Sequence, residues 1–200
     1  MLVPLRVVKL GGSLLAWSGL REALRAWRSR QAPAIDVLVV GGGVAADWIR
    51  QADQLHELGD DAAHQLAIQA MQLNARLAEA IWPEALTLTS LEAIRHRSLA
   101  PGLWILQPWP ALADAEQAKY GAVLPHTWNV TSDSIAAWVA QAADADELVL
   151  LKSDLPPDSA IGACAASGYV DRYFPAVTLG IPMTRAVHLR SIDFAEALLR

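Results

Sequence analysis

Two glycine clusters, each placed directly after a short apolar run, could bind an anionic group such as a phosphate. The first lies in KLGGS, and its candidate residues are Lys9, Gly11, Gly12 and Ser13. The second lies in VLVVGGG, and its candidates are Gly41, Gly42 and Gly43. Glycine lets backbone amides approach a phosphate closely, and a lysine beside them adds charge. The alternative is that both clusters are only tight strand-to-helix turns.

Neither cluster fits the best-known glycine-rich motifs. The P-loop pattern GxxxxGK[ST] and the dinucleotide pattern GxGxxG both differ from KLGGS and VLVVGGG in the spacing of their glycines. We therefore expect an anion site of another type.

Two further segments carry charged residues that could join the glycine clusters. In WNVTSDSIAAWVA, Asp133 precedes an alanine-rich stretch, although Thr131, Ser132 or Asp133 could each serve only as a helix cap. In ELVLLKSDLPPD, an apolar run ends at Lys152. A lysine there could reach a nucleotide phosphate, or it could be a solvated strand end.

Two acidic residues beside the expected helices could recognise a substrate. A helix that begins near Asp60 puts Asp60 and His64 on one face, where a carboxylate could receive an amino group. The alternative is a capping aspartate and a partly buried structural histidine. Asp47 and Arg50, just after the second glycine cluster, form another candidate pair, with a solvated helix start as the alternative.

Short apolar runs alternate along the chain with alanine-rich segments of helical periodicity. The runs interpreted as strands are RVVKL, DVLVV, LWILQ, ELVLL and AVHL. The segments interpreted as helices are residues 20–30, 60–82, 132–143 and 191–200. This alternation predicts an α/β fold, a three-layer αβα sandwich with a mostly parallel central sheet. Because the carboxyl ends of parallel strands share one edge, the candidate residues should meet there.

Composition limits the class of protein. A chain of 200 residues with 54% hydrophobic composition suits a single domain spanning residues 1–200. The net charge of −5, without a Lys/Arg block or a long apolar stretch, argues against nucleic-acid and membrane partners. The single cysteine, Cys164, fits a reducing cytoplasm, and the histidines show no metal-ligand spacing.

The four segments, in this order, resemble the amino acid kinase superfamily, which includes acetylglutamate, aspartate, uridylate and isopentenyl phosphate kinases. The resemblance is strongest at residues 7–15, 38–47 and 127–154. It implies that the first glycine loop and its lysine hold the donor phosphates of ATP, and that the second glycine loop faces the acceptor. It also implies Mg²⁺, held mainly by the nucleotide phosphates.

The resemblance assigns roles to the remaining candidates. Asp133 would orient a catalytic lysine rather than remove a proton, so the implied catalytic residues are Lys9, Asp133 and Lys152. ATP would also contact Ser153 and Asp154. The candidate acceptor-binding residues, apart from the second glycine loop, are Asp47, Asp60, His64, Asn129 and Thr131. One departure is that residues 155–200 contain no lysine, where larger family members carry a second catalytic lysine. Either Lys152 substitutes for it or Lys9 acts alone.

A narrower resemblance joins the chain to a group of small aspartokinase-related kinases. It rests on LPHTWNVTSDSIAAW, HELGDDAAHQLAIQAM and GYVDRYFPAV. The group includes the methanofuran-biosynthesis kinase that converts [5-(aminomethyl)furan-3-yl]methyl phosphate to its diphosphate. The resemblance implies an ATP-dependent phosphotransferase for a small phosphomonoester, acting as a cytoplasmic homo-oligomer. The alternatives are another small phosphate or carboxylate acceptor, or a nucleotide-binding storage or sensor protein.

Overall fold

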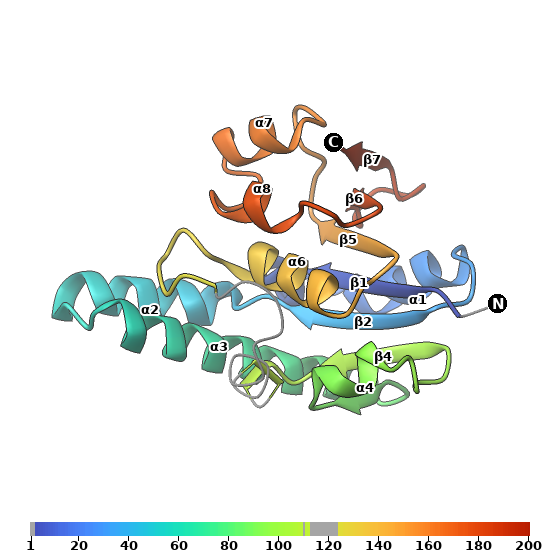
Figure 1. Cartoon of the computed structure of the whole chain (residues 1–200), viewed down its shortest axis with the longest axis horizontal. Helices are drawn as coiled ribbons and strands as arrows, with labels where there is room; N and C mark the ends of the chain where they lie inside the picture. The colour runs from blue at the N-terminus through green and yellow to red at the C-terminus, as the bar shows by residue number, and fades with distance from the viewer. Residues whose placement is uncertain (1–2, 110, 113–123) are drawn as a thin grey trace.

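The computed structural model describes residues 3–109, 111–112 and 124–200, and its centre is a seven-stranded sheet (Figure 1). The strands are β1 (Leu5–Leu10), β2 (Ile35–Val40), β3 (Leu86–Leu88), β4 (Gly102–Leu106), β5 (Glu147–Lys152), β6 (Thr184–His188) and β7 (Glu196–Leu199). Their order across the sheet is β3-β4-β2-β1-β5-β6-β7. Every pair is parallel except β6 with β7. The mostly parallel sheet is therefore confirmed.

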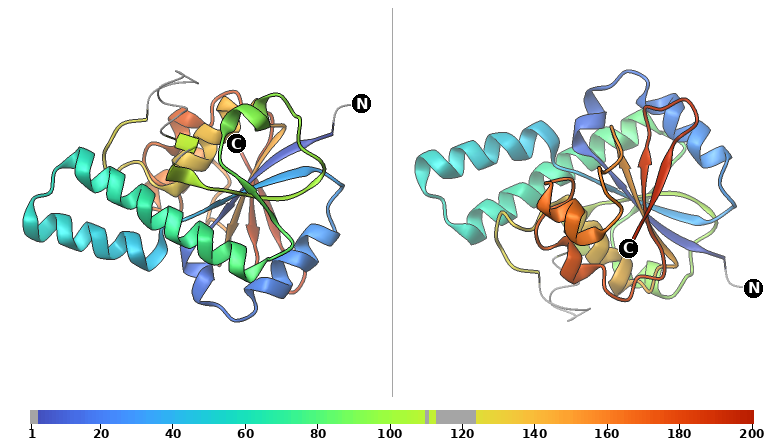
Figure 2. Two further views of the ribbon diagram at one scale, coloured as in Figure 1. Left: turned by 90° about the horizontal axis from the view of Figure 1, so that it is seen from below. Right: turned by 90° about the horizontal axis from the view of Figure 1, so that it is seen from above.

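Helices on both faces complete three layers (Figure 2). The longer helices are α1 (Leu20–Ser29), α2 (Gly43–His56), α3 (Asp60–Ile81) and α6 (Ser132–Ala142). The shorter ones are η1 (Gly12–Ala16), α4 (Leu91–Arg95), α7 (Ile161–Ala166) and α8 (Phe174–Val177). None of the helices in the described ranges is both long and apolar enough to cross a membrane.

Alternate side chains of the buried strands enter two separate cores, as the two faces of a pleated sheet require. On one face, Val7 and Leu150 pack with α6, α8 and part of α3. On the other, Val8 and Leu151 pack with α1 and the end of α3. β1 and β2 are buried along their whole length, which explains their continuous apolar sequences.

The carboxyl ends of the three central strands lie in register at one edge. The Gly11 amide, just after β1, donates to the Leu151 carbonyl of β5 at 2.9 Å, and the Gly41 amide, just after β2, donates to the Leu10 carbonyl at 2.9 Å. The sheet therefore holds both glycine loops and the end of β5 side by side, as the sequence predicted.

One expected element is wrong. Residues 191–200 were expected to form a helix, but they form a turn followed by β7. Phe194 adopts a left-handed conformation with φ 55° and is buried, which ends any helical run there. β7 then pairs antiparallel with β6, from Val187 opposite Glu196 to Thr184 opposite Leu199. Strand pairing at this exposed sheet edge outweighs the local helical pattern.

Candidate active site

The central feature is one carboxylate shared by two lysines. Asp133 Oδ1 lies 2.8 Å from Lys9 Nζ, and Asp133 Oδ2 lies 3.0 Å from Lys152 Nζ. The side chains are 8%, 7% and 14% exposed for Asp133, Lys9 and Lys152, respectively. The structure thus brings together the three residues that the sequence analysis proposed as catalytic.

Neighbouring elements place these three groups. Lys9 is the fifth residue of β1, and Lys152 ends β5, the adjacent parallel strand. Asp133 lies in the first turn of α6, where Thr131 is the N-cap and its hydroxyl accepts from the Asp133 amide at 3.4 Å. Capping and charge pairing therefore occur together, so the two interpretations of this segment are compatible.

Burial and charge act in opposite directions on the groups of this cluster. Burial alone would raise the pKa of Asp133, but the charges and hydrogen bonds of Lys9 and Lys152 outweigh it, so that pKa lies below its usual value. Burial lowers the pKa of Lys152, Asp133 opposes that decrease, and Lys9 adds to it. Lys152 also donates to the backbone carbonyl of Tyr169 and lies 4.3 Å from the centre of its ring. With two lysines and one carboxylate, the cluster has a formal excess of one positive charge.

The two glycine loops touch each other directly. A Cβ on Gly12 would lie 2.4 Å from the Gly43 nitrogen, and one on Gly41 would lie 2.9 Å from Ser132 Oγ. Gly43 also has a left-handed backbone with φ +51°. Side chains at these positions would force the loops and the start of α6 apart, so close approach explains the glycines. Asn74 of α3 supports the second loop by donating to the Gly41 carbonyl at 2.7 Å.

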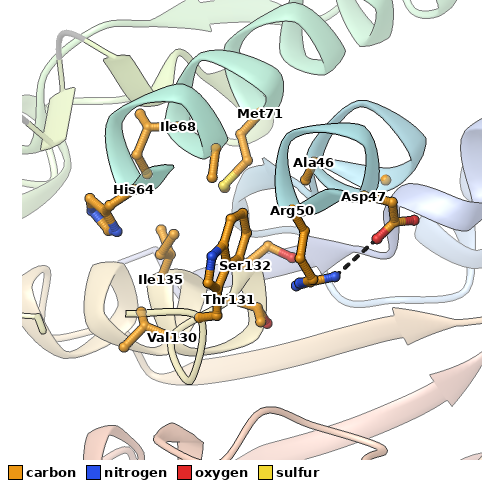
Figure 3. A pocket seen from close by; sticks show the side chains of 14 residues that line it. Ala46, Asp47, Arg50, His64, Ile68, Met71, Val130, Thr131, Ser132 and Ile135 are labelled. Atoms are coloured by element: carbon orange, nitrogen blue, oxygen red, sulfur yellow. Dashed lines mark hydrogen bonds and ion pairs between the residues drawn. The ribbon is translucent and has the colours of Figure 1, made fainter. Parts of the chain in front are cut away.

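A cavity of about 170 Å³ opens beside the second glycine loop (Figure 3). Its polar wall contains Gly42, Gly43, Thr131 and Ser132, and its apolar wall contains Ala67, Ile68, Met71, Val130 and Ile135. Asp47, Arg50, His64 and Trp128 also line it. Ile68 and Met71 continue the face of α3 on which His64 lies, as the helical spacing predicted.

Arg50 and Trp128 form a stacked pair at this cavity. The Arg50 guanidinium lies 4.6 Å from the Trp128 ring centre and 3.1 Å from Asp47 Oδ1. The Trp128 indole nitrogen donates to Asp53 Oδ2 at 2.8 Å. Asp47 and Arg50 form the pair that their spacing suggested. The contacts of Trp128 with Arg50 and Asp53 were not predicted, because α2 lies far from Trp128 in the chain.

The proposed Asp60 and His64 pair divides between two cavities. Asp60 lines a separate cavity of about 20 Å³, whereas His64 contributes to both. Burial is the main reason that the pKa of His64 falls to about 4, with a smaller contribution from His126, which stacks on it at 4.2 Å between ring centres. His64 is therefore an uncharged imidazole near neutral pH.

A second, polar cavity of about 450 Å³ lies on the other side of the segment before α6. Asn129, Thr131, Asp133, Ser167, Gly168, Asp171 and Arg172 are among its lining residues. It shares Trp128 and Thr131 with the first cavity. Asp133 thus lines the second cavity, while its two carboxylate oxygens contact Lys9 and Lys152.

Ser13, Ser153 and Asp154 are among the candidates that line neither cavity. Ser13 is exposed within η1, and Ser153 and Asp154 follow β5 outside the lining of both cavities. The side chain of Asp154 is 86% exposed. Asp171 was missed altogether by the sequence analysis, although its segment GYVDRYFPAV was singled out. An aspartate followed by residues that begin a short helix was the available signal.

Known proteins resemble this chain in sequence and in fold. The sequence profile of the amino acid kinase family matches residues 4–154, which include both glycine loops, Asp133 and Lys152. A kinase of Methanocaldococcus jannaschii, [5-(aminomethyl)furan-3-yl]methyl phosphate kinase, is 29% identical over 150 residues. That match covers 73% of this chain and 64% of the relative, so the chain accounts for less than two thirds of the relative's length.

Solved structures share the fold at low sequence identity. UMP kinase from Ureaplasma parvum is 13% identical, with a TM-score of 0.66 over 96% of this chain and 92% of that one. Aspartate kinase from Synechocystis is 14% identical, with a TM-score of 0.66 over 98% of this chain and 40% of that one. Together with the profile match over most of its length, the shared three-layer architecture leads to one conclusion: this chain belongs to the amino acid kinase family.

Proposed function

We propose that this protein is an ATP-dependent phosphotransferase that acts on a small anionic acceptor. The observation that carries the proposal is the buried Lys9–Asp133–Lys152 cluster beside two touching glycine loops. Phosphoryl transfer requires two anionic groups to be aligned and their charge to be offset. An excess positive charge beside backbone amides meets both requirements.

Lys9 and Lys152 stabilise charge on the transferring group, and Asp133 holds their ammonium groups in place. Support for this division comes from Asp133, whose two oxygens face the lysines and whose pKa is lowered, so it is a poor proton acceptor. A phosphate or carboxylate acceptor is already an anion and needs no strong base. The Gly12 amide would bind donor phosphates, with Ser13, Ser153 and Asp154 at the edge of this site. The Gly11 amide is already bonded to the Leu151 carbonyl, so Gly11 would contribute by letting a phosphate approach the backbone closely.

The residues fit a triphosphate better than a metal held by protein side chains. Asp133 is occupied by lysines, and within the part of the chain that the structure describes no three His, Cys, Asp or Glu side chains gather as metal ligands. Mg²⁺ brought in by ATP would offset part of the negative charge of the donor phosphates.

The proposed acceptor is [5-(aminomethyl)furan-3-yl]methyl phosphate, bound in the cavity beside Gly41, Gly42 and Gly43. The volume of this cavity, about 170 Å³, is below the ~300–1,000 Å³ of pockets for drug-sized ligands, which favours a small acceptor molecule. The apolar wall suits a small ring, and Thr131 and Ser132 face the reacting end. Because His64 is uncharged and Asp60 lines the smaller cavity, Asp47 is the better candidate for the aminomethyl cation.

Acceptor-dependent ADP release from Mg-ATP tests the proposal. The furan phosphate should release ADP, and Lys9→Ala should abolish most of that release while preserving the fold. UMP, acetylglutamate and aspartate serve as comparison acceptors, because a different preferred acceptor would retain the kinase and refute the furan assignment. A storage or sensor protein would bind Mg-ATP in calorimetry but release no ADP with any acceptor.

We also propose a cytoplasmic homo-oligomer. Support comes from apolar side chains that are 45–78% exposed along the pair α2 and α3, which reaches past the sheet in Figure 2: Val44, Trp48, Leu55, Leu73 and Leu77. Exposed apolar stripes of this kind commonly mark interfaces. Analytical ultracentrifugation of the wild type and Trp48→Glu tests this, and a monomer in both samples would contradict it.

A further inference from the structure

Outside the Lys9–Asp133–Lys152 cluster, the side chain of Asp171 accepts six hydrogen bonds. Its Oδ2 accepts from the Thr131 amide at 3.0 Å, the Thr131 hydroxyl at 2.8 Å and the Ser134 amide at 3.0 Å. Its Oδ1 accepts from the Ser134 hydroxyl and from the amides of Tyr173 at 3.1 Å and Phe174 at 3.0 Å. A carboxylate offers about four lone-pair sites, so these six donors fill its capacity.

The six donors belong to two segments that are distant in the sequence. Tyr173 and Phe174 are the N-cap and the first residue of α8, whereas Thr131 and Ser134 are the N-cap and the third residue of α6, 40 and 37 residues before Asp171. The Asp171 carboxylate therefore fastens the start of α6 to the start of α8. Because its oxygens are filled by protein donors, it offers little binding capacity to a substrate.

The contact with Thr131 extends to Asp133. The Thr131 hydroxyl has one proton, which it donates to Asp171, so its lone pairs point elsewhere and accept from the Asp133 amide at 3.4 Å. Asp171 thereby fixes the rotamer of the N-cap that orients the first turn of α6. Asp133 lies in that turn, and its two oxygens contact the two lysines.

We propose that Asp171 is a positioning residue that holds Asp133 between Lys9 and Lys152. Its catalytic consequence rests on the proposed phosphotransferase function, whereas its effect on the start of α6 does not. Asp171 touches neither lysine in a hydrogen bond, so it acts through Thr131 and Ser134 and through its charge. Burial lowers the pKa of Lys152, Asp133 opposes that decrease most strongly, and Asp171 adds a weaker opposing contribution.

Asp171→Asn is the main variant, because it keeps the shape but replaces one acceptor oxygen with a donor that faces other donors. Asp158→Asn is the matched control, since Asp158 also accepts a backbone amide just before a short helix, that of Ala160 at 2.8 Å, without contacting α6. We expect kcat of acceptor-dependent ADP release to fall about 10²-fold in Asp171→Asn, the usual effect of a small misplacement. KM for either substrate should stay near the wild-type value, and the control should behave as wild type.

The pH profile separates positioning from a general loss of structure. The groups that face Lys152 are Asp133 of α6, Lys9 of β1, Cys164 of α7, and Tyr169 and Asp171 before α8. We expect kcat to fall at alkaline pH as Lys152 loses its proton. Because Asp171 raises the pKa of Lys152, removing its negative charge should make this fall begin at a lower pH than in the wild type. An unchanged profile with wild-type kcat would overturn the proposal.

Hydrogen exchange decides the structural step without any turnover. In Asp171→Asn, the amides of Thr131 and Ser134 should exchange faster, while amides of β1 and β5 should keep their wild-type protection. The control variant should leave all of them unchanged. Wild-type exchange at Thr131 and Ser134 would refute the positioning role even if the kinase is active. Faster exchange in Asp171→Asn, together with no ADP release by the wild-type protein, would refute the proposed function and retain the positioning role.

Discussion

The two ends of the same strands carry opposite arrangements of charge. Around the amino ends of β1, β2, β5 and β6, Arg6 and Arg185 pair with Asp36 and Glu147. Arg28 of α1 and Glu196 of the antiparallel strand β7 join them, giving three basic and three acidic groups. Arg6 alone lies 2.6 Å from Asp36 and 2.7 Å from Glu147, its neighbours across β2 and β5. At the carboxyl ends, two lysines share one carboxylate.

The difference distinguishes a structural network from a binding site. In the amino-end network the guanidinium groups of Arg6 and Arg185 also lie over the Trp27 ring, at 5.9 Å and 5.7 Å from its centre. The positive charges of this network are therefore balanced by side chains of the protein itself. The carboxyl-end cluster has an excess positive charge and opens onto a polar cavity through Asp133. A balanced buried network contributes to folding, whereas an unbalanced one is suited to an anionic ligand.

Arg6→Met should produce the largest effect, and the effect should be on stability. Removing one partner from a buried charge network costs about 3–5 kcal/mol of unfolding free energy. Urea denaturation measures the loss, and Arg25→Met, which removes an exposed pair with Glu84 whose side chains are both 47% exposed, is the control and should change little. A wild-type urea midpoint for Arg6→Met would mean that the amino-end network is not a source of stability.

Lys9→Met should affect turnover more than stability. Loss of one charge-stabilising group typically lowers kcat about 10²–10³-fold, while Asp133 keeps Lys152 as its partner and the fold persists. Steady-state ADP release and urea denaturation on the same sample measure both quantities. The comparison between the two sheet edges fails if Lys9→Met destabilises the protein as much as Arg6→Met or keeps its kcat.

Gly12→Ala should disturb the carboxyl edge by crowding rather than by charge. The new methyl group would collide with the backbone of Gly43, and overpacking of this kind costs about 1–3 kcal/mol. We expect lower kcat together with this loss, because both loops shift. Gly162→Ala is the matched control: nothing lies within 4 Å of its added Cβ, so the same substitution should be neutral or slightly stabilising. Equal behaviour of the two variants would contradict the close approach of the loops.

The smallest expected effect is the fall in unfolding free energy at acid pH that protonation of Asp133 causes. Its pKa in the folded protein is below the ordinary value of 3.8, so its stabilising contribution is complete above that value and is lost as pH falls through the lower one. Asp133→Asn should flatten this part of the curve of unfolding free energy against pH. Identical curves for the variant and the wild type below pH 3.8 would show that Asp133 adds nothing to acid sensitivity.

The central strands and the three catalytic candidates were predictable because their signals are local. β1 and β5 are continuous apolar runs, and parallel strands bring their carboxyl ends together. Contacts across long sequence separations were not predictable. Asp171 acts on residues 37 to 40 positions earlier, and β7 forms by antiparallel pairing with β6 at the edge of the sheet. Neither contact is visible in the residues themselves.

The most direct test compares Lys9→Ala with Arg6→Met in acceptor-dependent ADP release from Mg-ATP, using the furan phosphate and normalising to the folded fraction of each sample. We predict that the folded molecules of Arg6→Met keep the wild-type turnover, whereas Lys9→Ala loses most of its turnover although it remains folded. Equal turnover in folded Lys9→Ala and wild type would contradict phosphoryl transfer at the carboxyl edge of the sheet.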